Sequence, residues 1–191
     1  MSDLSEWMSR FDPEARYRQL GGIKGWIIAA WLVAFSLYQV YFAIFPAPPA
    51  QKHLSIHLAF AIGAIFFLYP ATKQGDRSKL AHADLVLAIV SVAATTYWVY
   101  NFEPLIGRIG NFTVLDYIFG GVTMLLVMEA TRRVVGLPIV IIASVFLLYT
   151  LFGDLFGGFL QHRGYDLDRV IGHMYFTSEG LFGTPLQVSA K

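Results

Sequence analysis

GWIIAAWLVAFSLYQVYFAIF, residues 25–45, is the stretch that decides the class of fold. It runs for 21 residues without a charged side chain, which matches the ~20 residues needed to cross the ~30 Å apolar core of a bilayer. It is longer than the roughly 7 to 15 apolar residues of a signal peptide, and it follows a leader with four acidic residues. We therefore predict a retained membrane-spanning helix.

Further apolar blocks follow along the chain, separated by short segments rich in proline, glycine or charge. The apolar blocks are residues 54–71, 80–100, 114–128 and 137–152. The links expected to be turns or loops are residues 46–53, 72–79 and 101–113. This pattern predicts an all-α integral membrane protein: a four-helix transmembrane block, a fifth transmembrane helix and a partial interfacial or re-entrant segment.

The positions of Lys and Arg predict the orientation, because loops rich in these residues stay in the cytoplasm. The N-terminal tail (residues 1–24), the second link and the end of the fourth block hold nine of them, against Lys52 and Arg108 in the two opposite links. We expect a cytoplasmic N-terminus. In the tail itself, Trp7, Phe11 and Tyr17 with a helix start at Asp12-Pro13-Glu14 suit an interfacial helix as well as a solvated segment.

The overall composition excludes several functions. Hydrophobic residues make up 56% of the chain and charged residues 14%, below the roughly 25% typical of soluble domains. The net charge is +1 and no basic patch is present, which argues against a nucleic-acid partner. The chain lacks cysteine, and it shows no nucleophile–base pair, phosphate-binding loop or metal-ligand cluster. We expect no enzyme activity, and we assign no catalytic, cofactor-binding or metal-binding residue.

Ionisable residues inside the apolar blocks are the candidates for function, because a charge in a bilayer is costly. Asp84 and Asp116 each lie about one turn inside a block, where water or a neighbouring Lys or Arg can reach them. We favour structural roles for both over ion transport. His53 and His57 lie four residues apart, which suits interfacial hydrogen bonding or, as an alternative, a metal or haem. His82 is expected at the opposite membrane face from His57.

Glu129, Arg132 and Arg133 close the fourth block. Their i,i+3 and i,i+4 spacings let the carboxylate meet either guanidinium on one helical face. We expect this group to anchor the helix end at the cytoplasmic headgroups.

The longest recognisable pattern begins at this point in the chain. It starts as MLLVMEATRRVV at Met124, continues through HMYFTSEG at residues 173–180 and reaches LFGTP at Pro185. This stretch resembles the fused permeases of tripartite ATP-independent periplasmic (TRAP) transporters. The residues that carry the resemblance, to which we assign structural roles, are Glu129, Arg132, Arg133, His173, Tyr175, Glu179, Gly183 and Pro185.

The resemblance implies both a domain organisation and a function. In that family a four-helix small permease precedes a large permease, and with a periplasmic solute-binding protein they import organic acids using the sodium gradient. By this comparison residues 25–133 are the small part, and residues 134–191 are the truncated start of the large part, with an interfacial helix at Asp166–Tyr175. The family's sodium and substrate sites lie outside the matched residues, so no substrate-binding residue is assigned.

We therefore expect a scaffold component of a TRAP-type transporter in the bacterial inner membrane, not competent for transport alone. Its expected partners are the remaining large permease, the periplasmic binding protein and the lipid bilayer. The chain would be a natural split subunit, a shortened product or a piece of a longer protein. The alternative is a haem-binding membrane anchor of a redox enzyme, suggested by His57, His82 and the four-helix count.

Overall fold

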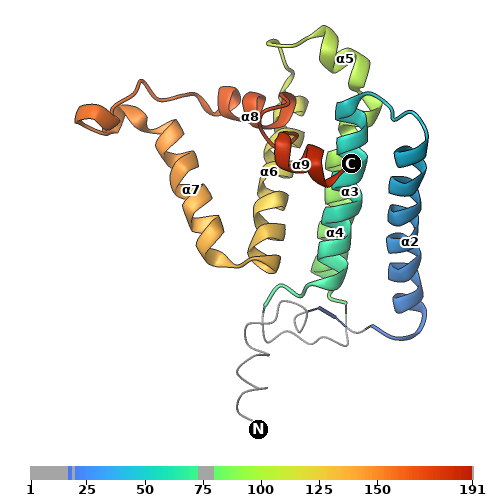
Figure 1. Cartoon of the computed structure of the whole chain (residues 1–191). Helices are drawn as coiled ribbons and strands as arrows, with labels where there is room; N and C mark the ends of the chain where they lie inside the picture. Colours follow the sequence, from blue (N-terminus) through green and yellow to red (C-terminus); the bar gives the residue numbers. More distant parts are fainter. Residues whose placement is uncertain (1–16, 19, 73–79, 191) are drawn as a thin grey trace, which may run out of the picture.

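The computed structural model describes residues 17, 18, 20–72 and 80–190, and every regular element in this part of the chain is a helix. Four helices are long and apolar enough to cross a membrane (Figure 1). They are α2 (Gly22–Ile44), α3 (Ala50–Leu68), α4 (His82–Tyr100) and α6 (Val114–Val134). The predicted class, an all-α membrane protein that passes the bilayer several times, is confirmed.

Shorter helices connect and follow these four. They are α5 (Phe102–Gly107), α7 (Leu137–Leu151), α8 (Leu167–Phe176) and α9 (Thr184–Ser189), with 3-10 turns at Gly153–Leu155 and Gly158–Leu160. The predicted helix at Asp166–Tyr175 corresponds to α8. Two predictions were wrong: the loop expected at residues 101–113 contains α5, and the turn expected at residues 46–53 ends at Pro49, because α3 begins at Ala50.

Two parts of the predicted organisation lie outside the described residues. One is the helix start at Asp12-Pro13-Glu14 together with Trp7 and Phe11. The other is most of the second link, residues 73–79.

Helices α3 and α4 form the centre of the block and pack along each other, with α6 against both. Helix α2 packs on α3, where Trp31 lies against Gly63 and its ring nitrogen donates to the carbonyl of Phe60 at 3.1 Å. We call the end of the block where α3 and α6 finish the Arg133 end. The other end, where α6 begins, is the Asp116 end.

Helix α7 leaves the four-helix block and the chain then returns to it. In Figure 1, α7 starts beside the end of α6 and runs back toward the Asp116 end, separate from the other long helices. None of its residues is buried. After a turn, α8 packs against α6, and α9 reaches the start of α3. The segment after the fourth helix therefore contributes to the core of the block.

Candidate functional site

A cluster of charged side chains lies inside the block at the Arg133 end. Asp84, in the first turn of α4, accepts hydrogen bonds from two arginines that are distant in sequence. The Nη1 atom of Arg133 lies 2.7 Å from Oδ1 of Asp84. Arg18 binds the other carboxylate oxygen. All three side chains are only 2% exposed, so each charge depends on its partners within the protein.

Arg18 also closes the end of α3. The last carbonyls of a helix have no partner within the helix and need donors from elsewhere. Arg18 Nη1 lies 3.1 Å from the carbonyl oxygen of Phe66 and 3.3 Å from that of Phe67. Its backbone N–H donates to Leu68 at 2.7 Å. One residue of the N-terminal segment therefore supplies donors to three consecutive carbonyls and a counter-charge to Asp84.

Glu129 extends the cluster along α6. Its Oε2 lies 2.7 Å from Nε of Arg132, and its Oε1 lies 2.7 Å from Nε of Arg133. The expected pairing at i,i+3 and i,i+4 is confirmed. The expected anchoring at the headgroups is wrong for Arg133, because its side chain turns into the protein, donates to the carbonyl of Tyr69 at 3.1 Å and lies over the ring of Phe66.

The helix ends explain why so many charges gather here. A helix N-terminus favours a negative charge and a helix C-terminus favours a positive one. Asp84 lies at the start of α4, whereas Arg132 and Arg133 lie at the end of α6. Arg132 also donates to the carbonyl of Ala71, just after α3, at 2.8 Å. We call Arg18, Asp84, Glu129, Arg132 and Arg133 the Asp84 cluster. Its contacts hold the end of α3, the start of α4 and the end of α6 together, so we describe it as a clamp.

Asp116 has a comparable local role at the opposite end. It forms a capping box with Thr113, whose backbone N–H and hydroxyl lie 2.7 and 2.8 Å from Oδ2 of Asp116. Its other oxygen accepts from Tyr97, and from Arg108 at 2.8 Å. The expectation that a nearby Arg would reach each aspartate is met at both positions. Both aspartates thus hold helix ends in place.

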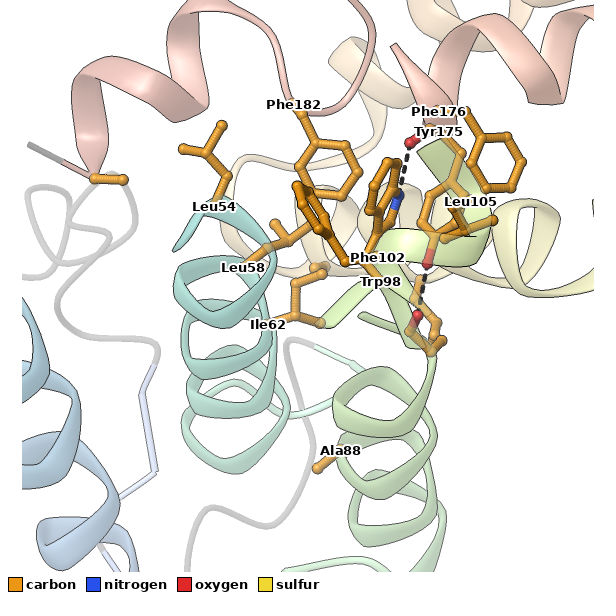
Figure 2. Packing of buried hydrophobic residues seen from close by; sticks show 14 of the residues in the cluster. Leu54, Leu58, Ile62, Ala88, Trp98, Phe102, Leu105, Tyr175, Phe176 and Phe182 are labelled. Atoms are coloured by element: carbon orange, nitrogen blue, oxygen red, sulfur yellow. Dashed lines mark hydrogen bonds between the residues drawn. The ribbon is translucent and has the colours of Figure 1, made fainter. Parts of the chain in front are cut away.

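An aromatic cluster joins α8 to the block near the Asp116 end, as Figure 2 shows. The indole nitrogen of Trp98 donates to the backbone carbonyl of Tyr175 at 3.1 Å, and the hydroxyl of Tyr175 donates to the carbonyl of Ala94 at 2.7 Å. Phe182 packs on the edge of Trp98, and both Tyr175 and Phe182 are fully buried. Burial raises the pKa of Tyr175, so its hydroxyl keeps the proton that it donates.

A glycine in α6 lets α8 approach closely. A Cβ atom placed on Gly120 would lie 2.6 Å from Cγ2 of Ile171 and 3.2 Å from Cβ of Tyr175. The neighbouring Gly121 would have its nearest such contact at 3.5 Å, with Ile171. Gly120 therefore has a packing role, because only at this position of the pair would a side chain collide with α8.

The remaining motif residues shape the chain between α8 and α9. His173 and Glu179 are exposed, with Nε2 of His173 3.9 Å from Oε2 of Glu179. Gly183 precedes α9 and its amide donates to the carbonyl of Gly180 at 3.0 Å. Pro185 lies in the first turn of α9, where a proline costs little. The motif is thus divided between the Asp84 cluster and the opposite end of the block.

The two histidines of α3 bind neighbouring protein groups. Nδ1 of His53 lies 2.9 Å from the hydroxyl of Tyr38, and Nε2 lies 3.0 Å from the carbonyl oxygen of Ala190. Nε2 of His57 lies 3.3 Å from Oγ of Ser189. The expected hydrogen-bonding role is confirmed, although one partner segment, α9, could not be foreseen.

The geometry separates the histidines that a haem would need. His57 lies 11 residues before the end of α3, roughly 16 Å along the helix, whereas His82 starts α4 at that same end of the block. Axial ligands to one iron must face each other across it. Within the described residues, no group of three or more His, Cys, Asp or Glu side chains is placed to hold a metal ion.

Comparison with protein families, with curated proteins and with solved structures returns no match to this chain.

Proposed function

We propose that this chain is a membrane scaffold component of a TRAP-type secondary transporter. In this proposal it lies in the bacterial inner membrane with a cytoplasmic N-terminus and braces a large permease segment that moves the solute. The complete transporter imports organic acids with sodium and a periplasmic binding protein. The chain does not transport alone.

One observation carries the proposal: four residues of the TRAP-like motif, Glu129, Arg132, Arg133 and Tyr175, hold helices together. Glu129 and Arg133 belong to the Asp84 cluster at one end of the block. Tyr175 is fully buried at the other end, against α4. A moving transport element needs contacts that break and reform, whereas buried polar groups that are paired across helices rigidify a structure. This arrangement supports a static, supporting role.

The exposed apolar surface of α7 favours the proposal that further helices of a large permease pack against this chain. The helix is apolar on all sides and has no buried residue, a composition that belongs in lipid or against other helices. It splays away from α6 and leaves a groove of about 340 Å³ lined almost entirely by apolar side chains. The first helix of a large permease segment would present such a surface to the helices that follow it.

The distribution of charge supports the proposed orientation. Arg18, Lys24, Arg132 and Arg133 lie at the Arg133 end, and Lys52, Arg108, Arg163 and Arg169 lie toward the opposite end, so the described residues alone are balanced. The excess comes from the sequence, which adds Arg10 and Arg16 ahead of α2 and Lys73, Arg77 and Lys79 between α3 and α4. The positive-inside rule places the end with the larger number in the cytoplasm.

Affinity purification from native membranes tests the proposal. We expect a tagged chain, solubilised in mild detergent, to recover a polypeptide of the large-permease type, and after chemical cross-linking a periplasmic binding protein. A second tagged multi-pass protein from the same membrane is the control. Recovery of neither partner above that control would overturn the assignment. Purified protein with a haem Soret band would instead favour the redox anchor.

A further inference from the structure

The loop between α7 and α8 is far more apolar than a loop exposed to water needs to be. Residues 152–160, FGDLFGGFL, contain one charged side chain and neither Lys nor Arg. We call them the apolar loop. Phe159 is 96% exposed and Leu155 is 77% exposed. Its other exposed large apolar residues are Phe152, Phe156 and Leu160. Soluble surfaces rarely gather so many apolar side chains, so the loop must meet an apolar partner.

The length of α7 indicates what that partner is. Its 15 residues span roughly 22 Å along the helix axis, about 8 Å less than the ~30 Å core of a bilayer. The helix starts at the Arg133 end, directly after α6 (Figure 1). A crossing that begins there stops short of the opposite boundary, and tilt makes the shortfall larger. The apolar loop is the segment that follows this short helix.

Some backbone carbonyls of the loop accept hydrogen bonds from within the chain. The amide of His162 donates to Gly153 at 3.1 Å, and the hydroxyl of Tyr149 donates to Leu160 at 2.6 Å. Near the end of α7, the amide of Tyr165 donates to the carbonyl of Thr150 at 3.0 Å. Water would serve these groups in an aqueous loop. In an apolar medium each unmade bond costs several kcal/mol, so internal partners are required.

The polar boundary follows directly after the loop. Tyr165 lies beneath two guanidinium groups, with Arg169 5.2 Å and Arg163 5.8 Å from the centre of its ring. Tyrosine and arginine together are typical of the headgroup level. The one charged residue of the loop, Asp154, lies against Gly164, beside this boundary. The order along the chain is therefore apolar helix, apolar turn and interfacial residues.

We propose that the apolar loop is immersed in the lipid leaflet at the Asp116 end, beside the last turn of α7. Its partner is the acyl region of the bilayer. The apolar loop then stays out of water, unlike the link between α4 and α6, which carries Glu103 and Arg108, and the chain reaches the headgroup level at Arg163 and Tyr165. Soluble partners at this end would therefore meet the α4–α6 link and not the apolar loop.

Spin labelling tests this placement, and the lack of cysteine makes it simple. Phe159→Cys in the full chain, labelled with a nitroxide and reconstituted in phosphatidylethanolamine–phosphatidylglycerol vesicles, reports collisions with oxygen or with a water-soluble nickel chelate. Ile109→Cys, on the α4–α6 link, is the aqueous control. Leu125→Cys, on the exposed side of α6, is the lipid control. All three positions are exposed, so the labels should not disturb folding.

We expect the label at position 159 to resemble that at position 125, with nickel collisions several-fold below those at position 109. Nickel collisions equal to those at position 109 would overturn the proposal in favour of an aqueous loop. Low collision rates with both agents would also overturn it, because they would indicate a protein partner. Leu155→Cys provides a second position at which the same outcome must appear.

Discussion

Oδ1 of Asp84 lies 2.7 Å from Nη1 of Arg133, and both side chains are 2% exposed although they belong to different helices. Removing one partner of a buried pair leaves an uncompensated charge, which typically costs about 3 to 5 kcal/mol. We expect Asp84→Asn to lower the free energy of unfolding in detergent micelles by about this amount. Asp168→Asn, in the exposed first turn of α8, is the matched control and should change it by less than about 0.5 kcal/mol. Equal effects would contradict a clamp at Asp84.

Arg18 should be harder to replace than its position near the start of the chain implies. Arg18→Ala removes the donors to Phe66 and Phe67 and one counter-charge of Asp84. We expect a marked fall in the thermal unfolding temperature. Arg18→Lys should recover only part of it, since an ammonium group lacks the planar set of donors. Lys24→Ala, at an exposed position, serves as the control, and a full rescue by Lys would show that charge alone matters.

The two neighbouring glycines of α6 should respond in opposite directions to the same change. Gly120→Ala forces its Cβ to 2.6 Å from Ile171, and such overpacking costs about 1 to 3 kcal/mol. Gly121→Ala meets only ordinary contact at 3.5 Å and gains up to about 1 kcal/mol of helix propensity. The stability change caused by each substitution can be measured by thermal unfolding and by the protease resistance of the segment after α7. Shifts of the same sign would show that α8 does not rest on Gly120.

In the aromatic cluster, the contribution of one hydrogen bond to stability can be compared with the contribution of one buried ring. Tyr175→Phe removes one hydrogen bond to Ala94, worth about 0.5 to 1.5 kcal/mol. Phe182→Ala empties a fully buried site and should cost about 3 to 5 kcal/mol. Chemical unfolding monitored by Trp98 and the other tryptophans would measure the two values. A larger loss for Tyr175→Phe than for Phe182→Ala would contradict a mainly hydrophobic junction.

Reporter fusions can measure the proposed orientation. A reporter active only outside the cytoplasm, inserted after Gly110 in the α4–α6 link, should be active. The same reporter fused before α2 should be silent, because the link and the N-terminal segment lie at opposite ends of the block. The reverse pattern would invert the orientation and remove one support of the proposed function.

Much of the fold follows from local sequence. The helix predicted at residues 80–100 is found at His82–Tyr100, because a mainly apolar run of this length has few alternatives in a bilayer. The start predicted for α3, Leu54, is four residues late, because the prolines of residues 46–53 indicate a turn and the uncharged run begins only after His53. In the structure the ammonium group of Lys52 lies 4.5 Å from the ring centre of Phe102, and His53 binds Tyr38. These partners satisfy polar groups in a first helical turn.

The clusters themselves depend on contacts between distant residues. Glu129 meets Arg132 and Arg133 by helical spacing, so that part could be predicted. Asp84 lies 66 residues from Arg18 and 49 from Arg133, and no periodic pattern links residues so far apart. The same holds for Trp98 and Tyr175, which are 77 residues apart. A single sequence indicates that such groups need partners, and tertiary packing decides which ones.

The partners of Asp84 become available at different times during synthesis. Arg18 precedes α4 in the chain, whereas Arg133 follows Asp84 by 49 residues. At a ribosomal rate of about 5 to 20 residues per second, this is an interval of roughly 2 to 10 s. Until α6 has been made, Asp84 has only Arg18 from its cluster as a counter-ion. During synthesis, Arg18 is therefore the first counter-ion available to the carboxylate of Asp84. Arg133, at the end of α6, becomes the second one later.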